Sequence, residues 1–521
     1  MGPIDWTIVF LYIFGIVVLG YLVGKTQRGR LDYFLAGRKM GPWPVALSMI
    51  STQISAISLI GAPAFVALRK GGGLFWLQYE LAVPLAMVAI MFFLVPAYGK
   101  KGEVSIYAVL EENLGKKARR TVSVIFLLSR AMGTGVALFA TSVVASVCLG
   151  LPVAHTIIIA GTVTVLYTTM GGIKADIYSD IIQLFIFVAG VLFSLGFVAV
   201  YLTQNGVPLS FPDPSRVRAL KLDQWGFAPG ETFGFWPMLL GGFFLYISYY
   251  GCDQSQAQRL LTTPSAEVSR KALLINGLLR FPITMLYLFF GLLLIPFINS
   301  HPEFQRMLLG KPSNFLVPTF IIRFFPAGLK GLMVSGIFAA TMSSADSALN
   351  SLSAITWSEF VREGKWGKKL REMPVLRGLT VLWGGFALAS AFLFMKASQT
   401  VIELVNKIGS AFYGPVLAAF AMAVLLQGVK EGWALAGLGA GVILNLFLWA
   451  FLPDKVSWMW WNLTGFAIPL LVVFFISLLS REKIRTKKVI FPSRAKNLAL
   501  PLLAAFPLFL ALSFLLEKLL R

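Results

Sequence analysis

Three serines on one side of the apolar segment 327–353 are the residues best placed to do chemistry. Ala340, Ser343, Ser344 and Ser347 are separated by three or four positions, so a helix would align them on one face. Hydroxyl and free carbonyl oxygens suit a hard cation such as sodium, without the desolvation cost of several carboxylates. The pattern predicts a sodium site, unless each hydroxyl only bonds a carbonyl of its own helix.

Ionisable side chains inside apolar segments form the second set of candidates, because burying charge in a membrane is costly and usually functional. Asp346 lies one turn beyond Ser343, and Asp180 lies near the start of the segment 177–203. Asp180 could face Ser347 and complete a second cation site. Alternatively, Asp180 is a carboxylate at a helix start, stabilised there by the helix dipole.

Two arginines lie well inside apolar segments and are candidates for holding an anion. Arg130 and Arg280 could each neutralise a substrate carboxylate, or could extend the guanidinium to the membrane surface. Glu403 and Lys407 are four positions apart, as expected for a pair on one helix.

Three apolar segments, 43–67, 233–252 and 400–427, contain sequences that disfavour an uninterrupted helix. The first is the richest, with polar residues followed by Gly61 and Pro63; these polar residues are Ser51, Thr52, Gln53, Ser55 and Ser58. Broken helices expose backbone groups that bind ions and substrates at mid-membrane. Small residues can also simply allow close helix packing. Because the first two segments are five helices apart and cross in opposite directions, they predict inverted five-helix repeats.

The composition indicates that these elements belong to an all-α polytopic membrane protein. Of the 521 residues, 57% are hydrophobic and only 13% are charged, which excludes a soluble globular enzyme. The two cysteines exclude a disulfide scaffold. About 14 transmembrane helices are predicted, at 4–23, 43–67, 74–98, 122–148, 152–170, 177–203, 233–252, 273–297, 327–353, 378–396, 400–427, 432–452, 459–480 and 498–517.

The distribution of positive charge predicts the orientation. The segments that follow odd-numbered helices hold 29 of the 45 Lys and Arg residues, so we expect them to be cytoplasmic and both termini to be extracytoplasmic. The net charge of +22 therefore reflects the cytoplasmic loops of a multi-pass protein of the plasma membrane. Because the sequence lacks a long glycosylated loop, we expect this membrane to be a bacterial inner membrane. The predicted partners are a small-molecule solute and the lipid bilayer, with no nucleic acid and no obligatory protein partner.

The predicted organisation has a leading part, two repeats and a C-terminal part. These are a first helix with its cytoplasmic loop at 1–42, the first inverted repeat at 43–203, an extracellular loop at 204–232, the second inverted repeat at 233–427, and three additional helices at 428–521.

Five segments make the chain resemble the sodium:solute symporter family, which includes sodium–glucose, proline, iodide, sialic acid and monocarboxylate transporters. They are DYFLAGRKMGPWPVALS (32–48), MGGIKADIYSDIIQ (170–183), YYGCDQSQAQRLL (249–261), AATMSSADSALNS (339–351) and KIGSAFYGP (407–415). The resemblance implies a LeuT-like fold of two inverted five-helix repeats, and one sodium ion or two.

The resemblance also implies roles for individual residues. The first sodium site would use the carbonyls of Ser51, Ile54 and Ala340 and the hydroxyls of Ser343 and Ser344. A second cation site would add Asp180 and Ser347 to Ser343. Asp346 stands where some members have a serine, which would strengthen that site electrostatically while changing its ligands.

The implied substrate contacts favour an anion over a sugar. Ile57 and Ser58 replace an acidic residue and a glutamine of the sugar transporters, and Gln53 replaces an aspartate of the proline transporters. Tyr249 matches the aromatic inner gate. Arg280 matches a sugar-contacting lysine, and its planar fork suits a carboxylate. The candidate substrate or gate residues are Gln53, Ser55, Ser58, Tyr249 and Arg280.

The sequence therefore predicts sodium-coupled symport of a small organic solute, with a preference for a carboxylate, by alternating access. It predicts no enzyme, since no clustered acid/base or metal constellation is visible for a membrane-embedded transferase. Two alternatives remain open. One is a proton-coupled carrier that titrates Asp180 or Asp346, and the other is a solute sensor that does not transport.

Overall fold

The computed structural model describes residues 1–25, 30–98, 105–168, 173–362, 372–397, 399–453, 455–488 and 492–520, and these are almost entirely helical. The elements up to residue 216 are α1 (Pro3–Lys25), α2 (Arg30–Leu35), η1 (Ala36–Arg38), α3 (Pro42–Gln53), α4 (Ala56–Ala67), η2 (Leu74–Trp76), α5 (Leu77–Glu80), α6 (Ala82–Ala89), η3 (Ile90–Leu94), η4 (Val95–Ala97), α7 (Ala108–Leu114), α8 (Lys116–Leu149), α9 (Val153–Thr168), α10 (Ile173–Gln204) and η5 (Pro214–Arg216).

The remaining elements begin with a π-turn and end with the long C-terminal helix. They are η6 (Pro237–Gly241), α11 (Gly242–Cys252), α12 (Gln254–Leu261), α13 (Ala266–Asn299), α14 (Pro302–Leu308), η7 (Ser313–Phe315), α15 (Leu316–Phe324), α16 (Leu329–Thr356), η8 (Trp357–Val361), α17 (Glu372–Phe394), α18 (Val401–Leu425), β1 (Leu426–Gln427), α19 (Glu431–Phe451), α20 (Trp460–Leu479), β2 (Arg485–Thr486) and α21 (Ser493–Leu520). The two short strands pair antiparallel, with Leu426 opposite Thr486.

The long helices make this a multi-pass membrane protein. Among the described residues, nine helices are long and apolar enough to cross a membrane, and the bent pair α3–α4 makes a tenth. Three further apolar helical stretches are shorter: Pro3–Ile16, Val153–Val165 and Leu329–Phe338. Helices satisfy their backbone hydrogen bonds internally, which is why apolar runs adopt them in lipid.

The interruption predicted in the segment 43–67 is confirmed. The chain leaves the helical conformation at Ile54 (φ −85°, ψ 78°), and α3 and α4 are bent by 53° to each other. Ser55 then caps α4, because its side-chain oxygen accepts a hydrogen bond from the N–H of Ile57 at 3.3 Å. The polar residues therefore surround a break where α3 ends and α4 begins, and where backbone groups lack partners within their own helix.

The second predicted interruption is also confirmed, at Asp253 between α11 and α12. Asp253 is extended (φ −84°, ψ 123°), and its carboxylate accepts hydrogen bonds from the N–H of Ser255 at 2.8 Å and from its hydroxyl at 2.6 Å. A capping carboxylate of this kind begins a new helix immediately after the break.

The third predicted interruption, in KIGSAFYGP, is wrong, because α18 runs without a break from Val401 to Leu425. The small residues there serve packing instead. A Cβ added at Gly414 would lie 2.5 Å from the carbonyl oxygen of Asn462 in α20. Glycine and serine in an apolar segment can indicate either a broken helix or close contact between helices, and a single sequence does not distinguish the two.

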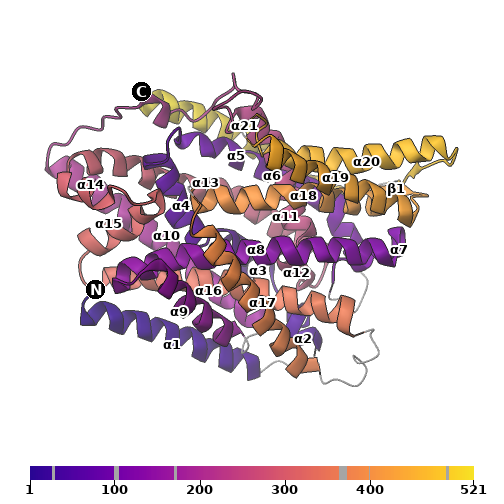
Figure 1. The fold of residues 1–521 in the computed structure, drawn as a ribbon, viewed down its shortest axis with the longest axis horizontal. Helices are drawn as coiled ribbons and strands as arrows, with labels where there is room; N and C mark the ends of the chain where they lie inside the picture. The colour runs from indigo at the N-terminus through magenta and orange to yellow at the C-terminus, as the bar shows by residue number, and fades with distance from the viewer. Residues whose placement is uncertain are drawn as a thin grey trace.

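The helices run roughly along the long dimension of the molecule (Figure 1). Both termini lie at one end, together with α14 and α15, and the opposite end carries α2, α7 and β1. Near the centre, α3 packs against α10, α13 and α16, and α18 packs against α8, α11 and α20. The broken helices are thus enclosed by long continuous ones.

Candidate functional site

A small cavity of about 100 Å³ lies where the broken helices meet the middle of the bundle. All five predicted substrate or gate residues line it, namely Gln53, Ser55, Ser58, Tyr249 and Arg280. Their elements are the α3–α4 break, α11 and α13. The structure therefore brings these residues, which are far apart in the chain, together beside the break between α3 and α4.

A buried ion pair forms one wall of this central cavity. The Nε of Arg280 donates to Oε2 of Glu80 at 3.0 Å, and Nη2 donates to Oε1 at 3.3 Å. Tyr246 donates its hydroxyl hydrogen to the same Oε1 at 3.0 Å. The two charged side chains are only 4% and 1% exposed, so removal of either one would leave a buried charge without its partner.

Arg280 keeps one donor free for another molecule. Its Nη1 is buried and has no hydrogen-bond partner among the described residues. An unsatisfied buried N–H of a charged group costs free energy, which a ligand with an acceptor oxygen would recover. Arg280 therefore has a buried donor that faces no acceptor among the described residues, while Glu80 already balances its charge.

A second guanidinium lines the same cavity from α8. Arg130 lies 3.8 Å from the carboxylate of Asp253, and its buried Nε has no hydrogen-bond partner in the described part of the chain. Arg130 therefore remains inside the bundle instead of extending to the membrane surface. Among the described residues, each of the two arginines that line the cavity therefore has a carboxylate near it, Glu80 beside Arg280 and Asp253 beside Arg130.

Tyrosines and a glutamine define the polar side of the cavity near the α11–α12 break. The hydroxyl of Tyr249 accepts a hydrogen bond from the side-chain amide of Gln256 at 3.0 Å, and that of Tyr250 donates to Oε1 of Gln53. The rings of Tyr249 and Tyr413 lie 6.0 Å apart. Tyr249 thus lies between the cavity and α12, where an aromatic gate is predicted.

The predicted first sodium site lies beside the same cavity. Ser51 and Ile54 are at the end of α3, where the last carbonyls of a helix have no partner within it. The hydroxyl of Ser344 in α16 lies 3.4 Å from the carbonyl oxygen of Thr52. This hydrogen bond brings α16 against the end of α3, next to the predicted ligands Ser51 and Ile54.

Two members of the predicted ligand set can be placed only by their position in the helix. The side chains of Ala340 and Ser343 lie outside the described part of the structure, although their backbone belongs to α16. Among the described residues, no group of three or more His, Cys, Asp and Glu side chains is arranged to hold a metal ion.

Two of the four residues of the predicted second cation site, Asp180 and Ser347, contact a buried arginine. Nη2 of Arg259, in α12, donates to Asp180 at 2.9 Å, to Asp176 at 3.1 Å and to the hydroxyl of Ser347 at 2.8 Å. Its Nε donates to the hydroxyl of Ser48 at 2.7 Å, which itself donates to Asp180 at 2.5 Å. In this arrangement a guanidinium supplies positive charge between Asp180 and Ser347.

This arginine cluster lies about one helical turn from the predicted first sodium site. Ser48 precedes Thr52 by four residues in α3, and Ser347 follows Ser344 by three in α16. The cluster joins α3, α10, α12 and α16. Asp346 faces a different partner, because its carboxylate accepts a hydrogen bond from the amide of Asn350 at 2.8 Å.

At the other side of the cavity, an ion pair joins α18 to the end of α4. Nη2 of Arg69 lies 2.9 Å from Oε1 of Glu403, which neighbours the cavity-lining Ile402. Glu403 also completes a capping box with Thr400. Lys407, the residue expected beside Glu403, places its ammonium over the rings of Trp449 and Trp461 at 5.8 and 5.9 Å.

Sequence reasoning missed Glu80 and the partners of Arg259. Glu80 is a carboxylate within a 24-residue apolar span, and that signal alone would have identified it as a candidate. Arg259 lies in the segment 253–272, which the distribution of positive charge predicts to be a cytoplasmic loop. Its contacts with α3, α10 and α16 depend on tertiary packing, which a single sequence does not reveal.

Comparison with known proteins agrees with this arrangement. The family model for the sodium:solute symporter family matches residues 33–441. The human sodium-coupled monocarboxylate transporter 1 is 27% identical over 434 residues, covering 82% of this chain and 69% of the relative. The sodium/sialic acid symporter NanT of Aliivibrio fischeri is 23% identical over 505 residues, covering 94% and 95%.

A solved structure shares the fold. An outward-open sodium-coupled sialic acid symporter superposes with a TM-score of 0.78 at 21% identity, covering 94% of this chain and all of that one. A nucleobase–cation symporter, Mhp1, superposes less closely, with a TM-score of 0.52 at 13% identity and coverage of 89% and 97%. Together with the family match over most of its length, this places the chain in the sodium:solute symporter family.

Proposed function

We propose that this protein couples the inward movement of sodium to the uptake of a small organic anion, a short monocarboxylate, by alternating access. The observation that carries the proposal is the free Nη1 of buried Arg280 in a cavity beside the Ser344–Thr52 oxygen pair. A carboxylate would satisfy the arginine, and sodium would satisfy the carbonyls of the break. Both would then share one enclosed space.

The proposal includes an architecture and a location. Each of the fourteen predicted segments overlaps helix, and the two broken helices, α3–α4 and α11–α12, are five segments apart. We propose two inverted five-helix repeats, at 43–203 and 233–427, in a bacterial inner membrane with both termini extracytoplasmic. The presence of both termini at one end of the bundle supports an even number of crossings (Figure 1).

The size of the cavity supports a small substrate. Pockets for drug-sized ligands have volumes of about 300–1,000 Å³, whereas this cavity measures about 100 Å³. Only a few non-hydrogen atoms fit the conformation described. Two guanidinium groups line the cavity, and each has a buried N–H without an acceptor among the described residues, which favours an anion over a cation.

The first sodium site in this proposal consists of the carbonyls of Ser51, Ile54 and Ala340 and the hydroxyls of Ser343 and Ser344. Sodium bound there would hold the broken α3–α4 helix against α16 and favour the outward-facing state. Each charge moved inward through 100 mV contributes about 2.3 kcal/mol to accumulation.

A second cation site at Asp180, Ser343, Asp346 and Ser347 remains part of the proposal, with Arg259 in a defined role. In the structure described, the guanidinium of Arg259 balances the charge of Asp180. A second sodium could bind Asp180 only if α12 moved and carried Arg259 away from this carboxylate. This links ion occupancy to the position of the α11–α12 break.

Binding of carboxylates to the purified protein tests the proposed substrate. Isothermal titration with lactate, propionate, glucose and proline should show heat only for lactate and propionate, the two monoanions, and only when sodium chloride replaces choline chloride. Equal binding of lactate in both salts would contradict sodium coupling, and binding of glucose instead of lactate would contradict the anion site.

Ser344→Ala is expected to weaken sodium about tenfold, since loss of one ligand hydroxyl costs on the order of 1.4 kcal/mol. The half-saturating sodium concentration for uptake or binding is the measurement. Ser353→Ala is the matched control, because Ser353 is a buried serine of α16 that bonds Leu349 and Thr380 instead. Unchanged sodium affinity in Ser344→Ala would remove α16 from the site.

A further inference from the structure

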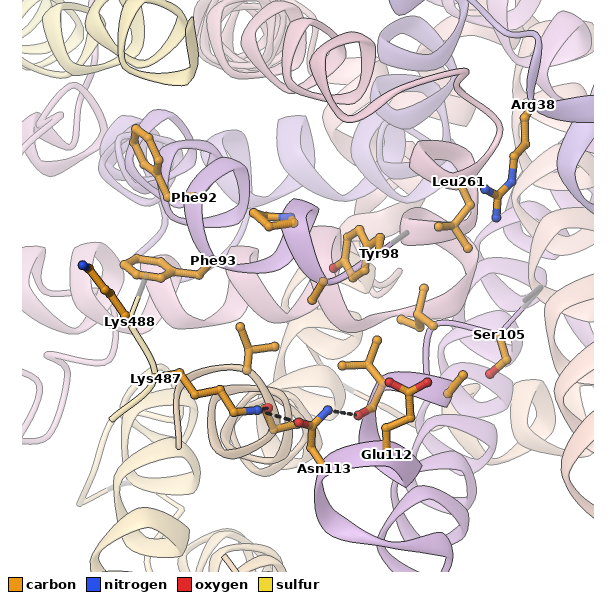
Figure 2. Close-up of a pocket in the computed structure, with 17 residues that line it drawn as sticks. Arg38, Phe92, Phe93, Tyr98, Ser105, Glu112, Asn113, Leu261, Lys487 and Lys488 are labelled. Carbon is orange, nitrogen blue, oxygen red and sulfur yellow. Dashed lines mark hydrogen bonds between the residues drawn. The ribbon is translucent and has the colours of Figure 1, made fainter. Parts of the chain in front are cut away.

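A second cavity, of about 480 Å³, lies at the end of the bundle that carries α2, α7 and the β1–β2 pair (Figures 1 and 2). Its walls come from η3 and η4, from α7, from the end of α18 and from the residues after β2. It shares no lining residue with the central cavity. Its volume lies within the range of about 300–1,000 Å³ that is usual for organic ligands.

One side of this end cavity is apolar and aromatic. The adjacent residues Phe92 and Phe93 both border it and are both half-buried (Figure 2). Both belong to the π-turn η3, Ile90–Leu94, and such turns often occur at functional sites. The lining continues with carbon surface from Val109 and Val424.

The other side carries unbalanced positive charge. The ammonium of Lys487 donates to Oδ1 of Asn113 at 2.5 Å and to the carbonyl of Ala423 at 2.7 Å, so neither of these acceptors is charged. Burial lowers the pKa of Lys487. Lys488 lies beside Phe93 and pairs with no acidic residue in the part of the chain that is described (Figure 2).

The chain holds Lys487 in place instead of leaving it loose at the surface. Its backbone N–H donates to the carbonyl of Leu425 at 2.7 Å, directly after the β1–β2 pairing. The cavity therefore has a fixed ammonium at one position and aromatic carbon nearby. Glu112 is the one acidic residue among those that line it.

The surroundings identify the chemistry of the occupant. This end of the bundle carries α2, α7 and the β1–β2 pair, which belong to predicted cytoplasmic segments rich in Lys and Arg, and in the proposed orientation it faces the cytoplasm. Basic pockets between membrane helices on that side bind anionic lipid headgroups. A soluble anion would gain nothing from the aromatic side of the cavity.

We propose that this end cavity binds an anionic phospholipid of the cytoplasmic leaflet, with its phosphate at Lys487 and Lys488 and an acyl chain along Phe92 and Phe93. The choice of leaflet rests on the proposed orientation of the transporter. The site does not depend on the identity of the transported solute or on sodium coupling.

Native mass spectrometry of the full-length protein in detergent tests this proposal, with palmitoyl-oleoyl phosphatidylglycerol and phosphatidylcholine as probes. The wild type should retain phosphatidylglycerol in preference to phosphatidylcholine. Lys487→Gln/Lys488→Gln should lose roughly thirty-fold in phosphatidylglycerol affinity. Lys483→Gln/Lys496→Gln is the matched control, since both residues are exposed on the same end and line no part of the cavity.

Three results would overturn the proposal. They are equal retention of the two lipids by the wild type, unchanged phosphatidylglycerol affinity in Lys487→Gln/Lys488→Gln, and displacement of the lipid by an equal concentration of glycerol phosphate. The last would indicate a site for soluble phosphate. These measurements involve no transport, so a failure of sodium-driven uptake would count against the proposed function alone.

Discussion

Arg280→Met is expected to lower carboxylate affinity about 100-fold or more. Truncating one partner of a buried, hydrogen-bonded charge pair costs about 2–5 kcal/mol, and about 2.7 kcal/mol corresponds to a factor of 100. The variant loses the free Nη1 donor and leaves Glu80 as an unbalanced negative charge at the cavity. Titration of lactate in saturating sodium measures the effect.

Two further variants separate recognition from folding. Glu80→Gln/Arg280→Met removes the lone carboxylate, so it should recover stability and still bind the anion poorly. Arg270→Met is the matched control, because Arg270 lies on the same helix but donates to the carbonyl of Met91, outside the central cavity. Normal affinity in the double variant would contradict a role of Arg280 in binding.

Arg259→Met is expected to destabilise the protein by about 3–5 kcal/mol, because it leaves the carboxylates of Asp176 and Asp180 buried without their cation. Chemical denaturation in detergent, followed by tryptophan fluorescence, is the measurement. Sodium should stabilise this variant more than the wild type if Asp180 and Ser347 accept a cation once the guanidinium is absent.

The triple variant Asp176→Asn/Asp180→Asn/Arg259→Met should recover most of that loss, since it buries no unpaired charge. Arg494→Met provides the surface control. Arg494 pairs with Glu267 while 82% exposed, so its removal should change stability by less than about 1 kcal/mol. Wild-type stability in Arg259→Met would show that the two carboxylates do not both need this guanidinium.

Predictions that rest on local sequence are largely confirmed by the structure. The polar residues around Ser51 and Ser55 disfavour a continuous helix by themselves, and the break lies between them at Ile54. The sequence around Asp253 likewise contains its own helix cap. Apolar runs of about 20 residues identify helices because each run forms its backbone hydrogen bonds within itself and needs no distant partner.

Pairings between distant segments could not be predicted in the same way. Glu80 and Arg280 are 200 positions apart, and Arg259 lies 83 positions from Asp176. A charged residue in an apolar segment indicates that a partner is needed, but a single sequence does not identify that partner. This is why Arg280 was expected to be a free cation, whereas the structure balances it with Glu80 and leaves only Nη1 available.

We propose that a sodium gradient, acting through the break in α3–α4 and through α16, drives accumulation of a small carboxylate. Uptake of radiolabelled lactate into proteoliposomes measures this directly, with an inward sodium gradient, an inward proton gradient or no gradient. Lactate should accumulate above equilibrium only with the sodium gradient, and this accumulation should be lost when sodium is equal on both sides. Accumulation driven by protons without sodium would contradict sodium coupling.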